Sequence, residues 1–397
     1  MELLLGFIRG ENDIQFAQDM TNINQNIQKF IPVFLVGIGL ILVFAVAMYS
    51  RYNNQDPRSL GYSGKPVPVE VSFPDITEST PSSTPSPQIT KKMPLYLGFS
   101  FEPFDDQHIA DMSKMVGDNQ TIANTYLQWG NPGNSRFTPE LFQVFTRRNM
   151  TPMITWEPWV PGAGVNQSEY SLAVISGGKY DDYIRQSANE IKKYGRPVFI
   201  RFAHEMNGDW YPWSGTVNGN TPSQYVATWK HVVDIFKSEN VSNVTWVWCP
   251  NAGSYPAVPA NDLSRYYPGD AYTDWVGLDG YNWGEYQGSQ GWNSFDKIFG
   301  TSFTKMSKIT SKSLMIAEVG SNELGGKKSD WMKEFLSPNL TQKYPQLGAI
   351  IYFNLKKEVD WRIQSSPESL KAFVESLGRQ TIAKQVSTSN QKIIQSK

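Results

Sequence analysis

Eight short apolar segments alternate with amphipathic segments between residues 94 and 378, and this alternation constrains the fold more than any other feature of the chain. Regular alternation of strands with helices implies a sheet of parallel strands, and eight such units in a stretch of this size predict a single (β/α)8 TIM barrel. An open doubly wound sheet is the alternative, but no glycine-rich phosphate loop follows the first strand. The expected strands are 95–101, 121–129, 153–156, 198–204, 244–249, 275–281, 314–319 and 349–353, and the clearest helical segments are 180–194, 223–239, 294–310 and 329–336.

A membrane-spanning candidate precedes this region. Residues 30–49 carry no charged side chain, and a run of this length can cross a bilayer as a helix. The flanking lysines and arginines lean mildly toward a cytoplasmic barrel, but large domains are translocated regardless of such small differences. We therefore expect a transmembrane helix at residues 30–50 that anchors the chain in the lipid bilayer, with the barrel outside the cell. A cleaved, secreted form is the alternative, because Ala45-Val46-Ala47 resembles a cleavage site.

The remaining boundaries follow from composition. The stretch between the anchor and the barrel is rich in Ser, Thr and Pro, and it is too poor in apolar residues to offset its ordering entropy. The expected organisation is a polar N-terminal segment at 1–29, the anchor at 30–50, a Ser/Thr/Pro-rich linker at 51–93, the barrel at 94–378 and a polar tail at 379–397.

Charge and composition exclude several functions. Lys and Arg number 36 and Asp and Glu 37, a balance that argues against a nucleic-acid partner. The single cysteine, Cys249, allows no internal disulfide and no cysteine-based zinc site, and with only three histidines we expect neither a metal nor a cofactor. Aromatic residues make up 13% of the chain, which favours exposed rings that stack on a flat ligand. We expect the barrel to be monomeric.

Polar and aromatic residues follow nearly every expected strand. In a (β/α)8 barrel the active site lies at the carboxyl ends of the strands. Trp and Tyr rings can cover sugar rings there, while carboxylates and amides bind sugar hydroxyls. The sequence therefore predicts a carbohydrate-binding cleft at this end of the barrel.

Two glutamates stand out at these strand ends. Glu205 follows the fourth expected strand and Glu318 closes the seventh, which places them across the barrel mouth from each other. Hydrolysis of a glycosidic bond needs two carboxyl groups, one to protonate the leaving oxygen and one to attack or to assist water. We expect Glu205 and Glu318 to be this catalytic pair. The alternative is that either residue is a surface or salt-bridged carboxylate without a catalytic role.

The motif around Glu205 resembles glycoside hydrolase family 26, a retaining (β/α)8 family that holds mostly endo-β-1,4-mannanases and some mixed-linkage β-glucanases. The resemblance covers about residues 94–375 and rests on RFAHEMNG at 201–208, followed by WYPW at 210–213. It implies that Glu205 is the acid/base and Glu318 the nucleophile. It also implies that Tyr281 lies beside the nucleophile and that His204 contacts the sugar at the point of cleavage.

Further residues are expected to bind substrate. Trp156, Trp159, Trp210, Trp213 and Trp283 follow strand ends in loops, and we expect three of these five to contact sugar. The family's mannanases often carry a Trp at the end of the eighth strand, and here Trp361 is expected to replace it. Glu157 is expected to accept a sugar hydroxyl, and Arg201 to hold Glu318 ionised. Asn207, in the RFAHEMNG motif, completes the expected set.

Taken together, these features predict a retaining endo-β-1,4-mannanase-like enzyme that acts by double displacement, with its two carboxyl groups about 5 to 5.5 Å apart. A mixed-linkage β-1,3-1,4-glucanase using the same site is one alternative, and a membrane-anchored protein that binds glycans without turnover is another. A zinc-protease interpretation of His204-Glu205 fails, because the second histidine of that pattern would fall at Gly208.

Overall fold

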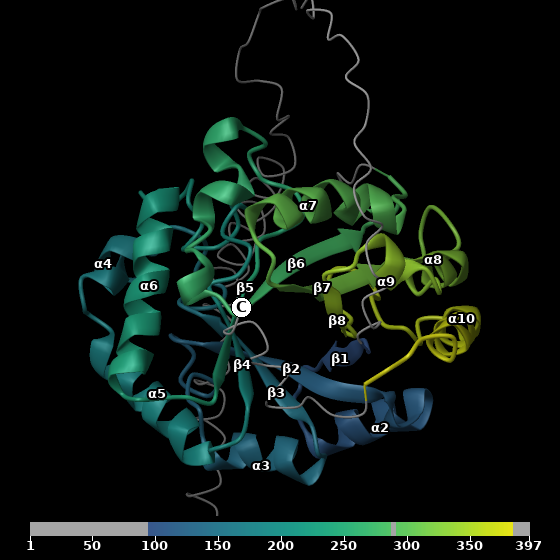
Figure 1. The fold of residues 1–397 in the computed structure, drawn as a ribbon, viewed down its shortest axis with the longest axis horizontal. Helices are drawn as coiled ribbons and strands as arrows, with labels where there is room; N and C mark the ends of the chain where they lie inside the picture. Colours follow the sequence, from purple (N-terminus) through teal and green to yellow (C-terminus); the bar gives the residue numbers. More distant parts are fainter. Residues whose placement is uncertain (1–93, 287–290, 384–397) are drawn as a thin grey trace, which may run out of the picture. The chain divides into compact units, whose positions relative to one another are not determined.

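The computed structural model describes residues 94–286 and 291–383, and these form a closed barrel of eight parallel strands. The strands pair in sequence order, and β1 closes the ring against β8. Figure 1 shows the strands around a central axis with the helices outside them. The strands are β1 (Tyr96–Ser100), β2 (Gln120–Gln128), β3 (Thr151–Glu157), β4 (Val198–Phe202), β5 (Val244–Trp248), β6 (Trp275–Asn282), β7 (Ser313–Ser321) and β8 (Leu347–Tyr352).

Helices follow the strands and cover the outside of the barrel. They are α2 (Asp106–Val116), α3 (Pro139–Arg147), α4 (Leu172–Ser176), α5 (Asp181–Tyr194), α6 (Pro222–Ser238), α7 (Phe295–Ile309), α8 (Lys328–Phe335), α9 (Leu340–Lys343) and α10 (Pro367–Leu377). Three of them, α3, α6 and α10, begin with a Thr or Ser cap followed by proline. The cap side chain accepts a free backbone N–H, and proline needs no hydrogen bond at the first helical position. These local signals fix where the helices start.

The strands are buried on both faces, as parallel strands in a barrel must be. One face of each strand fills the barrel interior and the other packs against the helices. The interior cluster includes Tyr96, Ile122, Met153, Phe199, Val247, Trp275, Met315 and Ile351. The larger outer cluster joins strand residues such as Phe99 and Ile200 to helix residues such as Val232 and Phe299. Two apolar layers therefore hold the strand ends, and the side chains that follow them, in fixed positions.

The expected barrel and its eight strands are confirmed, with differences at their ends. The fourth strand stops at Phe202 instead of continuing to residue 204. The predicted tail starts too early, because residues after 378 still contact the barrel: Leu95 N donates to Thr381 O, and Ala383 N donates to Leu95 O, both at 3.0 Å. The predicted anchor at 30–50, its neighbouring segments at 1–29 and 51–93, and the end of the tail lie outside the described residues. Within the described residues, no helix is both long and apolar enough to cross a membrane.

Candidate active site

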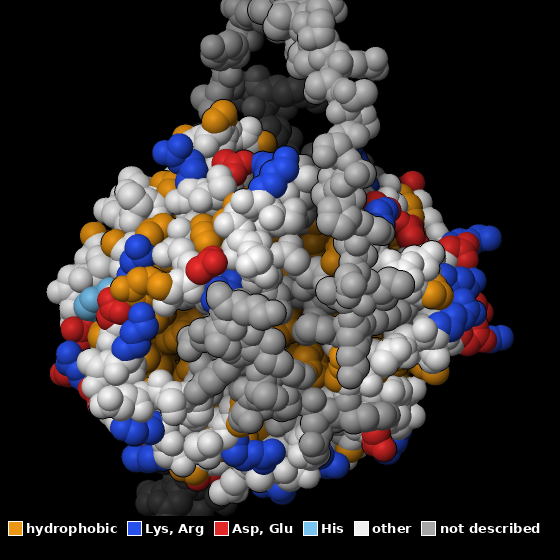
Figure 2. Space-filling view, in the orientation of Figure 1, with side chains coloured by type: hydrophobic (Ala, Val, Ile, Leu, Met, Phe, Trp, Pro, Cys, Tyr) orange, Lys and Arg blue, Asp and Glu red, His pale blue; other side chains and the backbone are white. Residues whose placement is uncertain are grey.

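A large cleft lies at the carboxyl ends of the strands. Its volume is about 1650 Å³. Figure 2 shows charged side chains of both signs, with hydrophobic side chains among them, spread over the described surface that faces the viewer. All eight strands, or the loops that follow them, contribute residues to the cleft, among them Glu102, Tyr126, Glu157, Glu205, Asn251, Tyr281, Glu318 and Trp361. The predicted catalytic pair therefore shares one cavity with aromatic rings and amides.

Glu318 is held in place by three donors. It lies within β7 and only 5% of the residue is exposed. Tyr126 Oη donates to Glu318 Oε1 at 2.7 Å, Arg201 Nη2 donates to the same oxygen, and Tyr281 Oη donates to Oε2. Burial opposes the charged form, but the Arg201 charge and the two hydroxyls outweigh it and lower the pKa of Glu318 to about 2. Glu318 is therefore ionised at neutral pH.

Arg201 is the cation at the base of the cleft. Its side chain is fully buried, and Nη1 contacts both oxygens of Asp279, at 2.8 and 2.7 Å. Thr155 Oγ1 accepts from Arg201 Nε and Nη2 at 3.0 and 2.7 Å, so the planar guanidinium has a fixed orientation. The structure thus brings Arg201 to Glu318, as expected from the sequence, although Arg201 lies beneath the cleft and does not line it.

A metal does not fit the acidic groups around Arg201. Donor atoms of His204, Asp279 and Glu318 lie within 4.8 Å of one another, a spacing that could hold an ion. However, Arg201 already bonds both carboxylates from within this group. A metal ion here would meet a buried positive charge at close range in a medium of low dielectric. The carboxylates of Asp279 and Glu318 therefore bind the guanidinium of Arg201 and leave no place for a metal ion.

Glu205 is presented to the cleft by a sharp turn after β4. Ala203 and Glu205 have φ values of 43° and 52°, in the left-handed region that non-glycine residues seldom adopt. The turn is fixed because Glu205 N donates to Cys249 O at 2.8 Å. Strain of this kind persists only where the surrounding structure holds it, and it is concentrated at functional sites. The turn explains why the strand ends two residues before the predicted boundary.

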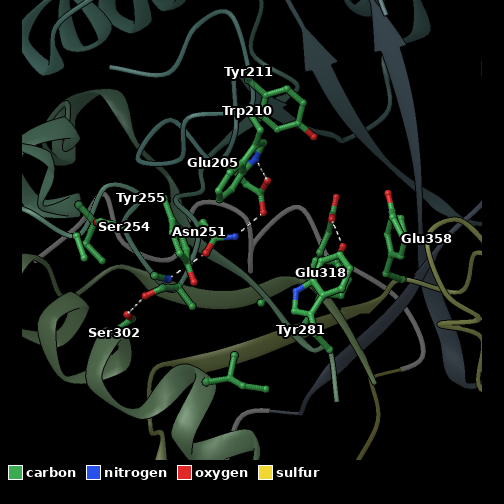
Figure 3. A pocket seen from close by; sticks show the side chains of 18 of the residues that line it. Glu205, Trp210, Tyr211, Asn251, Ser254, Tyr255, Tyr281, Ser302, Glu318 and Glu358 are labelled. Atoms are coloured by element: carbon green, nitrogen blue, oxygen red, sulfur yellow. Dashed lines mark hydrogen bonds between the residues drawn. The ribbon is translucent and has the colours of Figure 1, made fainter. Parts of the chain in front are cut away.

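The carboxyl group of Glu205 is bonded by two neutral donors. Trp210 Nε1 donates to Oε2 at 2.7 Å, and Asn251 Nδ2 donates to Oε1 at 2.8 Å. Burial, reinforced by the negative charge of Glu318, raises the pKa of Glu205 to about 7. In Figure 3 the carboxyl groups of Glu205 and Glu318 point into the same opening from different sides. One carboxyl is poised to hold a proton and the other is ionised, which is the division that acid-assisted nucleophilic attack requires.

His204 lies next to this pair and is buried. Its ring packs against Tyr211 and Trp213, with centroids 5.0 and 6.0 Å apart. Burial lowers the pKa of His204 well below its usual value, so the imidazole is neutral. Nδ1 has no hydrogen-bond partner among the described residues. His204 is not among the described residues that line the cleft. Its contact with sugar stays a prediction.

The tryptophans divide into two groups. Trp159, Trp210, Trp283 and Trp361 line the cleft, in agreement with their predicted location. Trp156 and Trp213, by contrast, are buried and do not belong to the cleft lining. Trp156 packs in the outer apolar layer, where Nε1 donates to Tyr183 Oη at 3.1 Å, and Trp213 Nε1 donates to His204 O at 2.6 Å. Trp156 and Trp213, two of the five candidates of which three were expected to contact sugar, therefore do not face the cleft, because side-chain direction along a strand or loop, and not proximity to its end, decides which ring does.

Two further predicted residues have different roles. Glu157 does line the cleft; it accepts from Gln128 Nε2 at 2.8 Å and from Trp159 Nε1 at 3.3 Å, and burial raises its pKa to about 7. Asn207 is fully buried, and its side chain exchanges hydrogen bonds of 2.9 and 2.8 Å with the backbone of Asn251. The prediction that Asn207 binds substrate is wrong: it fixes the loop that carries the Glu205 partner.

Sequence reasoning assigned no role to several residues of the site. Tyr126 lies in the middle of an apolar strand, where nothing in the local pattern distinguishes it from a core residue. Asn251 lies two residues after the fifth expected strand and Asp279 lies near the end of the sixth, so their position at the strand ends could have pointed to them. Lys357 and Tyr255 belong to long loops and line the cleft only because of how those loops fold.

Comparison with known proteins identifies the family. The family model described as glycosyl hydrolase family 26 matches residues 109–334, more than half of the chain. The chain is 37% identical over 277 residues to Endoglucanase H of Acetivibrio thermocellus, an alignment that covers 68% of this chain and 29% of that protein. It is 24% identical over 219 residues to mannan endo-1,4-β-mannosidase A and B of Caldalkalibacillus mannanilyticus, covering 49% of this chain and 37% of the relative. The chain thus spans less than two fifths of the length of these two relatives.

Among solved structures, a family 26 β-mannanase from Bacteroides ovatus matches 77% of this chain and 94% of its own, with a TM-score of 0.57 and 19% identity. At this level of identity the likeness shows the shared barrel fold. The match of the family model spans both Glu205 and Glu318. The chain belongs to glycosyl hydrolase family 26.

Proposed function

We propose that the protein is a retaining β-glycanase that cleaves its polysaccharide by double displacement. The observation that carries the proposal is the contrast between the two carboxyl groups of the cleft. Glu318 is bonded by a cation and two hydroxyls, which keep it ionised, whereas burial keeps Glu205 partly protonated at neutral pH. A retaining mechanism needs one carboxyl in each state.

In the first step, a carboxylate oxygen of Glu318 attacks the anomeric carbon while Glu205 gives its proton to the departing glycosidic oxygen. Tyr126, Arg201 and Tyr281 hold Glu318 in one orientation for this attack. As the covalent bond forms, Glu318 loses its negative charge, and this loss removes one of the causes that raise the pKa of Glu205.

In the second step, the ionised Glu205 takes a proton from water, and the water oxygen displaces Glu318 from the anomeric carbon. The released sugar keeps its original configuration, and both carboxyl groups return to their starting states. Trp210 and Asn251 hold Glu205 in position in both steps, since each is a neutral donor that accommodates the carboxylate as well as the acid.

Two substrates are proposed, and a specific observation supports each. The resemblance around Glu205 and the similarity to mannan endo-1,4-β-mannosidases favour a β-1,4-mannan. The 37% identity to a protein named Endoglucanase H, higher than the identity to any of the mannosidases compared, favours a β-glucan. The two polymers present the same kind of ring to Trp159, Trp210 and Trp283, and they differ in hydroxyl orientation and linkage.

The test is release of reducing sugar from glucomannan, galactomannan, mixed-linkage β-glucan and carboxymethylcellulose, with Glu318→Gln as the inactive control. Release from one polymer, abolished in the variant, supports the proposal and names the substrate. The configuration of the first-formed product, followed by proton NMR, then separates retention from inversion. Binding to a polymer without any release would favour a protein that recognises glycans without turnover.

We also propose that residues 30–50 anchor the chain in a lipid bilayer with the barrel outside the cell. The uncharged run at residues 30–49 supports this placement. Cell fractionation tests the anchor, and digestion of intact cells with an added protease tests the orientation. A full-length protein that stays in the soluble fraction without detergent would contradict the anchor.

A further inference from the structure

The loop between β8 and α10, residues 353–366, contributes one wall of the cleft, and a buried ammonium group bonds three of its carbonyls. Lys328 is the first residue of α8, and it is 0% exposed. Its Nζ lies 3.2, 3.0 and 2.8 Å from the carbonyl oxygens of Asp360, Trp361 and Arg362, and 2.8 Å from Ser365 Oγ. Three consecutive carbonyls of the loop thus converge on one side chain.

This use of a lysine is informative because burying an ammonium group is unfavourable unless hydrogen bonds replace its water. The four acceptors of Lys328 are neutral carbonyls and a hydroxyl, so they offset the loss of water without the attraction of a directly bonded carboxylate. Burial lowers the pKa of Lys328 to about 8, although the charges of Glu323 and Asp360 oppose this shift. The hydrogen bonds of the Lys328 ammonium group therefore serve to hold the backbone of the loop in one conformation.

The carbonyl at the centre of this cluster belongs to Trp361, which the loop presses against the catalytic side of the cleft. The Trp361 ring lies 4.8 Å from each of the rings of Tyr281 and Trp283. A Cβ atom at Gly320 would lie 3.2 Å from Cε3 of Trp361 and 3.4 Å from Cδ1 of Tyr281, closer than most such contacts, so β7 packs tightly against both rings there. Tyr281 in turn donates to Glu318. A change in the position of Trp361 would therefore shift the Tyr281 ring, whose hydroxyl bonds Glu318.

We infer that Lys328 is a positioning residue for catalysis: it fixes the nearly buried Trp361 ring, which backs Tyr281 and Trp283, the wall against which a sugar ring binds beside Glu318. The inference rests on the proposed function, because it assigns that wall to a β-linked pyranose. Lys328 itself contacts neither substrate nor the reacting carboxyl groups. Tyr352 assists from within the barrel wall, since its hydroxyl donates to the same Trp361 carbonyl at 2.9 Å.

The test compares Lys328→Met with Lys327→Met in the full-length protein. Lys327 is the neighbouring residue, is exposed, and serves as the matched control. We expect Lys328→Met to accelerate amide hydrogen exchange in residues 353–366 by at least about tenfold and to raise KM about tenfold, with kcat changed by less than about threefold. Lys327→Met should match the wild type in all three measurements. Unchanged exchange and unchanged KM in a folded, active Lys328→Met protein would overturn the inference.

A second variant covers the case in which Lys328→Met does not fold. Tyr352→Phe keeps the ring and removes only the hydroxyl that bonds the Trp361 carbonyl, and it should shift exchange and KM in the same direction by a smaller factor. A drop in melting temperature with the wild-type KM, in either variant, would mean a purely structural role and would contradict the inference. Wild-type protein that neither binds nor cleaves any of the four polymers would refute the proposed function instead, and the exchange data would still show whether Lys328 fixes the loop.

Discussion

Asn251 Nδ2 lies 2.8 Å from Glu205 Oε1, and this amide is one of two neutral groups that bond the Glu205 carboxyl. Across the cleft, Glu318 is bonded by the guanidinium of Arg201. The two glutamates are therefore separated in acidity by the charge of what surrounds them, since both are almost fully buried. This asymmetry is the basis of the first prediction.

Activity should follow a bell-shaped dependence on pH. Glu205 must carry a proton, so kcat/KM should fall as pH rises through about 7. Glu318 must be ionised, so kcat/KM should fall as pH drops toward about 2.

The alkaline limb of this profile should depend on Asn251. Asn251→Ala removes a hydrogen bond that favours the ionised form of Glu205, so the alkaline limb should move to higher pH. Initial rates on the best polymer across this range test both statements, and an alkaline limb that moves down in the variant would contradict them.

Replacing the acid should affect substrates according to their leaving groups. Glu205→Gln cannot protonate the departing oxygen, and we expect kcat/KM on a polysaccharide to fall by about 10² to 10⁴-fold. An aryl glycoside with an acidic phenol needs little protonation, so its first step should be nearly unaffected in the variant. Steady-state rates on both substrates make the comparison. A loss of equal size on both would argue against Glu205 as the acid.

Much of the fold could be predicted because local and global signals agree. Each apolar segment between residues 94 and 378 coincides with a strand of the barrel, and the Glu pair follows from the rule that barrel sites lie at the carboxyl ends of strands. What the pattern could not reveal was side-chain direction. Trp156 and Trp159 are three residues apart, yet one packs against the helices and the other lines the cleft.

The partners of the catalytic pair were harder to predict for a second reason. Tyr126 bonds Glu318 across 192 residues of sequence, and Asn207 acts through a loop 44 residues away. Such contacts are set by the closure of the barrel and by loop packing, for which a single sequence carries no local signal. Asn207 looked like a ligand because it follows Glu205 in the motif, whereas its amide serves the backbone of the neighbouring loop.

The division of the tryptophans predicts opposite effects from matched substitutions. Trp210→Phe shortens a ring of the cleft and removes a donor to Glu205, so we expect kcat/KM to fall about tenfold with little change in stability. Trp213→Phe removes buried volume and the hydrogen bond to His204 O, so we expect the free energy of unfolding to fall by about 1–3 kcal/mol. Urea unfolding and steady-state kinetics on both variants provide the test. The reverse pattern would place Trp213 at the substrate.

Glu157 should make the protein less stable at alkaline pH. Its pKa is raised to about 7 in the folded protein, so folding favours the protonated form; the associated stability is present below the pKa of about 4.3 in the unfolded chain and is lost as pH rises through about 7. Glu157→Gln cannot ionise, and it should therefore be more stable than the wild type by about 3 kcal/mol at pH 8, relative to the difference between the two proteins at pH 4. Urea unfolding at both pH values measures this difference. An offset between variant and wild type that is the same at both pH values would show that Glu157 is ionised in the folded protein as readily as in the unfolded chain.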